Sequence, residues 1–365
     1  MIEVTVRTRN GAYPVLIGNG LLQGLPKLLT EHVTAERFAV ISDDNVAPLY
    51  GEELLEAAHA VGLDSRLFTF PAGEASKTRK TWSILTDDLL EAGFGRDSCI
   101  IAVGGGVTTD IAGFVAATFL RGVPVVQVPT SYLAMIDASV GGKTGVDAKA
   151  GKNLVGAFHP PALVVADPQS LATLPREERA EGLVEAFKHG AILDEAYFEQ
   201  LNETVVALLD ADTKLSEEAV CRSVKLKAAV VSEDELESGY RQILNFGHTL
   251  GHALEAASGY RLGHGKAVAL GMVLEAELGE RLGVTDPGTR ERLEVSLKGL
   301  LGPTSNTPNP AESICFLASD KKVRAGKPRV VLLKKIGQVD PGDRWSHELP
   351  EEMLEGVFAA VLGVL

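Results

Sequence analysis

The chain has 365 residues, of which 45% are hydrophobic and 23% are charged, and its formal net charge at pH 7 is −14. This length predicts two domains, because single hydrophobic cores stop growing near ~250–300 residues. The negative charge argues against nucleic acid and anionic membranes as partners, since nothing offsets phosphate repulsion over the surface as a whole. An anionic small molecule is compatible with this charge where lysines converge locally.

Cysteine usage and hydropathy indicate the compartment. Cys99, Cys221 and Cys315 are far apart and odd in number, with no CxxC pair, which predicts free thiols in a reducing environment. The N-terminal stretch MIEVTVRTRN has no apolar signal core, and no apolar run in the sequence reaches ~18 residues. We therefore expect a cytoplasmic protein with no membrane segment.

Strand-like and helix-like stretches take turns through the N-terminal half. The expected strands are IEVTV (2–6), YPVLIG (13–18), RFAVISD (37–43), RLFTF (66–70), SCIIAVGGG (98–106), which runs into three glycines, and VPVVQVPTS (123–131). Between them, LYGEELLEAAHAVG (49–62) and TRKTWSILTDDLLEAG (78–93) read as helices. This alternation predicts a parallel sheet covered by helices on both faces, which binds ligands at the carboxyl ends of its strands.

A glycine-rich turn follows one of these strands. Gly104, Gly105 and Gly106 precede a helical run, so backbone N–H groups at a helix N-terminus can receive a pyrophosphate. The pattern is not GxGxxG, and a purely structural turn fits it equally well. Asp43 or Asp44, at the end of an earlier strand, could bond a ribose hydroxyl, which favours NAD over its 2′-phosphorylated form.

The segment MIDASVGGKTGVDAKAGKNLVGAFHPP (135–161) predicts ordered loops or a tight hairpin. It carries Lys143, Lys152 and Asn153, and lysines and an amide presented on such turns make a phosphate site. The glycine spacing before Lys143 is not that of a P-loop. The earlier loop PAGEASKT (71–78) adds Glu74 and Lys77, for which a solvated loop is the alternative interpretation.

From Pro175 onward long helical runs dominate, which places the expected domain boundary between 1–174 and 175–365. His248 and His252 stand four apart on one helical face, and His264 follows between two glycines. A catalytic zinc site takes three protein ligands from imidazoles and carboxylates. Spacing on the run REERAEGLVEAFKHGAIL (176–193) does not choose between Glu181 and Glu185 as the carboxylate, nor does it exclude His189.

These motifs together resemble the 3-dehydroquinate synthase family of sugar phosphate cyclases. The stretches that carry the resemblance, in the family's order, are GEASKT (73–78), GGGVTTDIAGFVAATFLRG (104–122), DASVGGKTGVD (137–147), GKNLVGAFHPP (151–161), EGLVEAFKHGAI (181–192), RQILNFGHTLGHALE (241–255), GHGKAVALGM (263–272) and DKK (320–322). GGKTGV and LNFGHTLGHALE are highly specific. The chain departs from the family pattern at Thr109, usually glycine, and Ala138, usually serine, so a positive φ at Thr109 is not expected.

The resemblance implies a fold and a set of site residues. The fold is an α/β N-terminal parallel-sheet (Rossmann-like) NAD domain followed by a mainly α-helical metal-binding domain. The implied ligands of a zinc or cobalt ion are Glu185, His248 and His264. The implied NAD contacts are Asp44, Glu74, Lys77, Gly105, Gly106, Val107, Asp110, Thr130, Ser131, Lys143, Lys152 and Thr173. The implied substrate contacts are Arg121, Asp137, Lys143, Asn153, Lys188, Lys227, Arg241, Asn245, His252, Lys321 and Lys322. The implied catalytic residues are His252, Lys152, Glu185 and Lys188.

The resemblance also implies an activity and its partners. The substrate is 3-deoxy-D-arabino-heptulosonate 7-phosphate, which yields 3-dehydroquinate and phosphate by transient NAD-dependent oxidation, phosphate elimination, reduction and intramolecular aldol cyclisation. The expected assembly is a homodimer. Three alternatives remain: a cyclase acting on another sugar phosphate, a metal-dependent polyol dehydrogenase, and a non-catalytic sensor of nucleotide or sugar phosphate. A sensor would be expected to have a broken metal triad, and a polyol dehydrogenase would have no reason to keep the phosphate-binding lysines.

Overall fold

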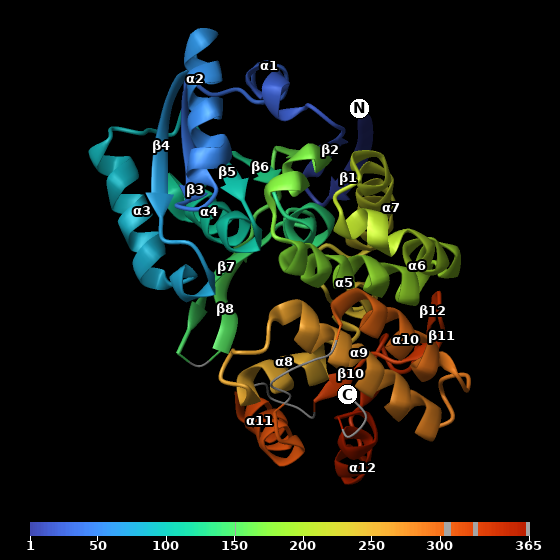
Figure 1. The fold of residues 1–365 in the computed structure, drawn as a ribbon. Coiled ribbons are helices and arrows are strands. Elements are labelled where there is room, and N and C mark those ends of the chain that lie inside the picture. The colour runs from blue at the N-terminus through green and yellow to red at the C-terminus, as the bar shows by residue number, and fades with distance from the viewer. Residues whose placement is uncertain (150, 303–307, 324–327, 363–365) are drawn as a thin grey trace. The chain divides into compact units, whose positions relative to one another are not determined.

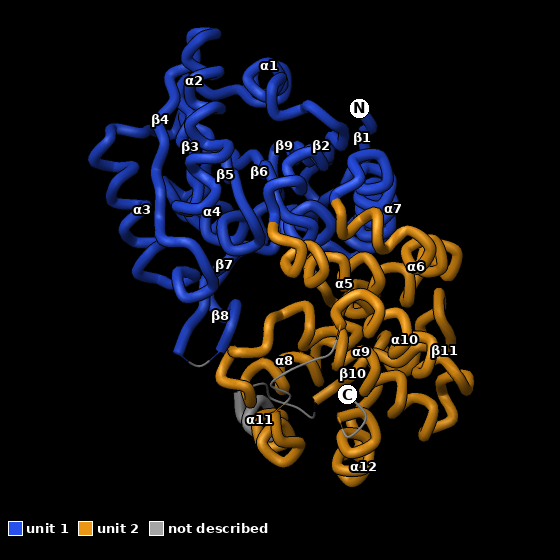
Figure 2. Tube along the Cα trace, viewed as in Figure 1, with its two compact units in different colours: residues 1–174, 211–235 blue, residues 175–210, 236–365 orange. Residues whose placement is uncertain are grey.

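The computed structural model describes residues 1–149, 151–302, 308–323 and 328–362, without the side chains of residues 318–323 (Figure 1). The chain forms two compact units, unit 1 with residues 1–174 and 211–235, and unit 2 with residues 175–210 and 236–365 (Figure 2). Within the described ranges, no helix has the length and apolar character needed to cross a membrane.

Unit 1 is built on one seven-stranded sheet. Its strands, in spatial order, are β1 (Ile2–Thr8), β2 (Gly11–Ile17), β9 (Leu163–Ala166), β6 (Val125–Pro129), β5 (Ser98–Gly104), β3 (Arg37–Asp43) and β4 (Asp64–Phe70). All neighbouring pairs are parallel except β1 and β2, which form an antiparallel hairpin. The expected Rossmann-like parallel sheet is confirmed.

Successive side chains of the central strands point to opposite faces of the sheet and pack into two separate apolar cores. On one face, Ala39 and Ile41 of β3 pack with apolar residues of α3 (Arg79–Glu91) and α4 (Gly106–Thr118). On the other face, Phe38 and Val40 pack with α1 (Leu25–His32) and α2 (Glu52–Ala60). Both faces of β3 are therefore buried, which explains why its central residues, 38–41, are apolar without interruption.

The remaining elements of unit 1 are short turns, one hairpin and one long helix. They are η1 (Leu22–Gly24), η2 (Ala47–Gly51), η3 (Glu74–Ser76), η4 (Phe119–Arg121), η5 (Ala134–Ala138), β7 (Lys143–Ala148), β8 (Gly151–Phe158), η6 (Pro168–Thr173) and α7 (Thr213–Glu233). The hairpin expected around Lys143 and Lys152 is the antiparallel pair β7–β8.

Helix α7 differs from the expected division of the chain. The sequence interpretation placed all residues from 175 onward in one domain, whereas α7 packs with unit 1. The reason is a set of contacts to unit 1: Ser232 accepts from the N–H of Arg7 in the edge strand β1 at 3.0 Å, and the buried Ser216 and Tyr132 hydroxyls lie 2.6 Å apart. These contacts join residues more than 80 positions apart, which no local pattern reveals.

Unit 2 is mainly helical. Its elements are α5 (Arg176–Leu193), α6 (Glu195–Leu209), η7 (Tyr240–Asn245), α8 (His248–Ala257), α9 (His264–Arg281), α10 (Thr289–Leu301), α11 (Pro310–Val323), β10 (Arg329–Val330), β11 (Leu333–Lys335), β12 (Gln338–Val339), β13 (His347–Glu348) and α12 (Glu351–Leu362). The expectation of a largely helical C-terminal region is confirmed, and the strands found among the described residues of unit 2 form two small antiparallel pairs.

Glycines allow α8 and α9 to approach backbone to backbone. A Cβ atom at Gly271 would lie 1.9 Å from the Gly247 carbonyl oxygen, and one at Gly251 would lie 2.7 Å from the Ala267 carbonyl oxygen. Gly247 itself has φ +80°, a conformation that L side chains rarely adopt. The spacing between these two helices therefore depends on the absence of side chains at their contact.

We expect Gly271→Ala to destabilise the protein by about 3 kcal/mol, because rigid backbone atoms cannot yield to the added methyl group. Gly299→Ala is the matched control: it also lies inside a helix, and a Cβ there meets nothing within 4 Å. That variant should be more stable than the wild type by ~0.5–1 kcal/mol. Urea unfolding measures both, and equal stabilities would contradict the packing argument.

Candidate functional site

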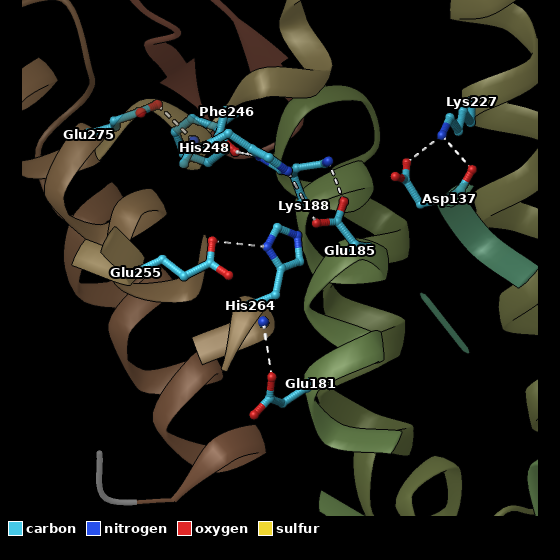
Figure 3. Close-up of polar contacts among 12 residues, drawn as sticks. Asp137, Glu181, Glu185, Lys188, Lys227, Phe246, His248, Glu255, His264 and Glu275 are labelled. Atoms are coloured by element: carbon cyan, nitrogen blue, oxygen red, sulfur yellow. Dashed lines mark hydrogen bonds and ion pairs between the residues drawn. The ribbon is translucent and has the colours of Figure 1, made fainter. Parts of the chain in front are cut away.

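Three helices of unit 2 bring a metal-type donor set together. Glu185 of α5, His248 at the start of α8 and His264 at the start of α9 each offer one ligand atom, and all of these atoms lie within 4.8 Å of one another (Figure 3). The His248 Nε2 atom lies 3.7 Å from Glu185 Oε1. Glu185 is buried, at 1% exposure. Two imidazoles and a carboxylate are the donors of a three-ligand catalytic zinc site.

The glycines around His264 explain how α9 reaches α5. A Cβ at Gly263 would lie 2.2 Å from the Glu181 carboxylate, and one at Gly265 would lie 2.4 Å from the Glu181 carbonyl oxygen. Glu181 accepts a hydrogen bond from the Gly265 N–H at 3.1 Å, so it caps the start of α9 (Figure 3). Of the alternatives left open by spacing, the structure thus gives Glu181 a capping contact and places Glu185 with the two histidines.

The His248 ring is held in one tautomer. Its Nδ1 atom lies 3.2 Å from the Phe246 carbonyl oxygen. A carbonyl only accepts hydrogen bonds, so Nδ1 carries the proton and Nε2, which faces Glu185, keeps its lone pair. Burial, followed by the charges of Lys188, His252 and His264, lowers the pKa of His248 well below its usual value. A neutral imidazole with a free Nε2 lone pair is the form that binds a metal.

Two more acidic or basic groups border this cluster. The Lys188 ammonium forms a buried ion pair with Glu185, three residues earlier on α5. The buried Glu255 carboxylate lies 3.7 Å from His264 Nδ1. Glu255, His264 and the exposed His252 form a second group that meets the same geometric condition, so His264 belongs to both. Glu255 lies on the same helix as His248 and His252, although the family resemblance assigned it no role.

In unit 1, the glycine turn starts α4 as expected. Gly105 is its extended N-cap and Gly106 its first residue, with Val107 and Asp110 in the first turns. Thr109 lies inside the helix with its hydroxyl donating to the Gly106 carbonyl oxygen at 2.9 Å, so this departure from the family pattern imposes no strain. The N–H of Thr130 donates to Gly104, and Ser131 accepts from the Ala134 N–H.

An ion-pair cluster lies beside this turn. Lys77, 5% exposed, is paired with Asp110 of α4. Burial lowers the pKa of Lys77, but Asp110 and Glu74 outweigh it and the net shift is upward. Glu74 also lies 3.2 Å from the Lys152 ammonium. The cluster therefore brings together Glu74, Lys77, Asp110 and Lys152, four of the residues named in advance.

Asp147 also belongs to this group of residues, although no role was assigned to it from the sequence. Its carboxylate accepts from the Asn153 N–H at 2.8 Å, and its own N–H donates to the Lys77 carbonyl oxygen at 2.8 Å. Asn153, in strand β8, has φ +56°, so this contact holds its backbone in an unusual conformation. The one feature of the sequence that could have indicated this contact is the position of Asp147, four residues after Lys143.

The aspartates at the end of β3 have different environments. Asp43 is buried and accepts from the Thr108 hydroxyl at 3.0 Å and from the Asn45 and Val46 N–H groups, which makes it a turn-forming residue. Asp44 is exposed and accepts from the Ala72 N–H at 2.7 Å. Of the two candidates for a ribose contact, only Asp44 presents its carboxylate to solvent. The Thr173 hydroxyl lies 2.7 Å from that of Tyr50.

The expected anion-binding residues are distributed over both units. In unit 1, Lys227 of α7 donates to the Asp137 carboxylate at 2.5 Å, while Lys143 and Arg121 are exposed. In unit 2, Arg241 is 1% exposed, and Asn245 donates to Glu237 at 2.7 Å. The side chains of Lys321 and Lys322 lie outside the described residues.

Comparisons with known proteins agree over most of the chain. The family model described as 3-dehydroquinate synthase N-terminal matches residues 67–181, and the one described as 3-dehydroquinate synthase C-terminal matches residues 182–323. A protein named 3-dehydroquinate synthase from Symbiobacterium thermophilum is 46% identical over 334 residues, which cover 90% of this chain and 92% of that protein.

Solved structures show the same fold. A 2-epi-5-epi-valiolone synthase from Streptomyces hygroscopicus subsp. jinggangensis 5008, with NAD⁺ and Zn²⁺ bound, has a TM-score of 0.87 at 28% identity, covering 97% of each chain. A 2-deoxy-scyllo-inosose synthase complexed with carbaglucose-6-phosphate, NAD⁺ and Co²⁺ has a TM-score of 0.88 at 24% identity, covering 97% of this chain and 100% of the other.

Proposed function

The chain belongs to the 3-dehydroquinate synthase family, and we propose that it converts 3-deoxy-D-arabino-heptulosonate 7-phosphate to 3-dehydroquinate and phosphate. The observation that carries the proposal is the donor set of Glu185, His248 and His264 in unit 2. A carbon–oxygen lyase reaction of this kind needs a group that polarises a substrate oxygen, and this set has the composition and spacing to hold one.

The residues present fit both cofactors. In unit 2, the free Nε2 lone pair of His248 faces the Glu185 carboxylate, which suits zinc or cobalt. In unit 1, the Gly105–Gly106 turn at the start of α4 leaves backbone N–H groups open to a pyrophosphate, and Asp44 is available to a ribose. The valiolone synthase with this fold, 28% identical, holds NAD⁺ and Zn²⁺.

When bound, the metal supplies Lewis-acid polarisation of the C5 oxygen, and NAD supplies reversible hydride transfer at C5. We assign the handling of the C5 proton to His252, which is exposed one helical turn after His248. The Lys188 ammonium, paired with Glu185, adds a positive charge that favours an anionic substrate beside the metal. Lys152, paired with Glu74, is assigned to the substrate and to the cofactor.

The remaining polar residues are assigned to the phosphate and carboxylate of the substrate. They are Arg121, Lys143, Asn153, Lys227, Arg241, Asn245, Lys321 and Lys322, with Asp137 holding Lys227. A polyol dehydrogenase substrate carries neither anion, so this set favours the cyclase reaction. The homodimer and the cytoplasmic location stay predictions, which light scattering and localisation can check.

The proposed reaction causes no net oxidation of the substrate, whereas a dehydrogenase reaction does. Phosphate can leave only after C5 has become a ketone, yet the product carries a reduced carbon there. Residues that retain substrate and cofactor together allow the hydride to return at high effective concentration. Incubation with the heptulosonate phosphate, NAD⁺ and Zn²⁺ should release phosphate and 3-dehydroquinate in equal amounts, with no net NADH absorbance. Stoichiometric NADH accumulation would identify a dehydrogenase instead.

Metal analysis tests the ligand assignment. Alanine at Glu185, His248 or His264 should remove bound metal and nearly abolish activity, because a three-ligand site loses one donor. His252→Ala is the matched control, since His252 borders the same cluster. His252→Ala should keep its metal and lose kcat by ~10²–10⁴, as is typical for a proton-transfer group. A metal-free His252→Ala protein beside a fully loaded His248→Ala protein would refute the assignment.

A further inference from the structure

We propose that Glu275 is a positioning residue of the metal site, because it accepts a hydrogen bond from the Gly247 N–H at the start of α8 and thereby fixes the segment that presents His248. This inference rests on the proposed metal site. Glu275 lies on α9, is fully buried at 0% exposure, and was indicated by no motif in the sequence. Its Oε2 atom accepts from the Gly247 N–H at 2.8 Å (Figure 3).

The start of α8 needs an acceptor that its own cap does not supply. The first N–H groups of any helix lack intrahelical acceptors, and a Ser, Thr, Asp or Asn side chain at the N-cap usually provides one. Here the N-cap is Gly247, which has no side chain. The backbone N–H groups of Thr249 and Leu250 face the Glu275 carboxyl group together with that of Gly247. Glu275 thus takes the place of the missing N-cap side chain.

Packing explains why the acceptor comes from another helix. A Cβ at Gly247 would lie 2.8 Å from the Val268 carbonyl oxygen and 2.9 Å from the Met272 N atom, and φ there is +80°. A capping side chain therefore cannot occupy this position. Gly271 touches Gly247 on the same face of α9, and residue 275 is one turn further along that face. Its side chain consequently points at the exposed N–H groups of α8.

The Glu275 carboxyl group and the start of α8 also contact a third segment, residues 329–331. The Val331 N–H faces the Glu275 carboxyl group, and the Thr249 hydroxyl donates to the Arg329 carbonyl oxygen at 2.7 Å. His248 lies between Gly247 and Thr249, and its ring position is set by the contact of Nδ1 with the Phe246 carbonyl oxygen. Fixing the backbone on both sides of His248 therefore fixes the direction of its Nε2 lone pair, on which coordination depends.

Burial raises the pKa of Glu275 to about 8, although the four backbone N–H groups act to lower it. Near neutral pH the side chain consequently carries a proton much of the time, and its oxygens still accept hydrogen bonds. A glutamine retains an acceptor oxygen and the same size, whereas a leucine retains the size alone. This difference makes Glu275→Gln a conservative variant and Glu275→Leu a disruptive one.

The experiment measures Zn²⁺ affinity by competition with a chelator, and amide hydrogen exchange in the metal-free protein. Glu275→Leu should bind Zn²⁺ about 10–100-fold more weakly, as loss of outer-shell support typically causes, and should lose protection at Gly247 and Thr249. Glu275→Gln should stay close to the wild type in both. Thr285→Val is the control for stability alone, because it removes a buried hydrogen bond to Leu333 away from α8 and should leave Zn²⁺ affinity unchanged.

Wild-type protein provides a check that does not depend on the variants folding. Its Gly247 and Thr249 amides should exchange slowly without metal, and rapid exchange would overturn the proposal. Wild-type Zn²⁺ affinity in Glu275→Leu would overturn it as well. Failure of the metal site itself gives a different result, namely unchanged Zn²⁺ affinity in His248→Ala with the α8 amides still protected.

Discussion

Backbone-to-backbone approach of helices in unit 2 is the constraint on which the candidate site depends. Gly271 and Gly251 let α9 and α8 touch, and Gly263 and Gly265 let the start of α9 touch α5. Each contact leaves no room for a Cβ atom. Because these helices converge so closely, the side chains at positions 185, 248 and 264 offer ligand atoms that all lie within 4.8 Å of one another. The donor set thus follows from glycine placement as much as from the ligands themselves.

Both units contain buried ion pairs, which hydrophobic packing alone does not require. Lys188 and Glu185 in unit 2, and Lys77 and Asp110 in unit 1, are ion pairs at or below about one-fifth exposure. Removing two charges from water costs several kcal/mol per ion, and apolar replacements are often as stable. We interpret their presence as a functional requirement: each pair holds a polar group beside a position where a metal or a dinucleotide would bind.

The sequence predicted the elements whose signal is local. RFAVISD and REERAEGLVEAFKHGAIL correspond to β3 and α5 residue for residue, because apolar runs and cap residues are read within one segment. The interpretation missed β9, a four-residue strand, and the assignment of α7 to unit 1, since both depend on distant partners. For the same reason, spacing did not separate Glu181 from Glu185, and nothing indicated Glu275, whose role exists only where α9 meets α8.

Helices α5, α8 and α9 are proposed to form one metal site with Glu185, His248 and His264 as its ligands. A crystal structure of the zinc-loaded protein, with anomalous scattering recorded at the zinc edge, tests this most directly. We expect a single strong peak at ~2.0–2.2 Å from the ligand atoms of those three residues. A peak coordinated by His252, Glu255 and His264 instead, the other donor group around His264, would contradict it.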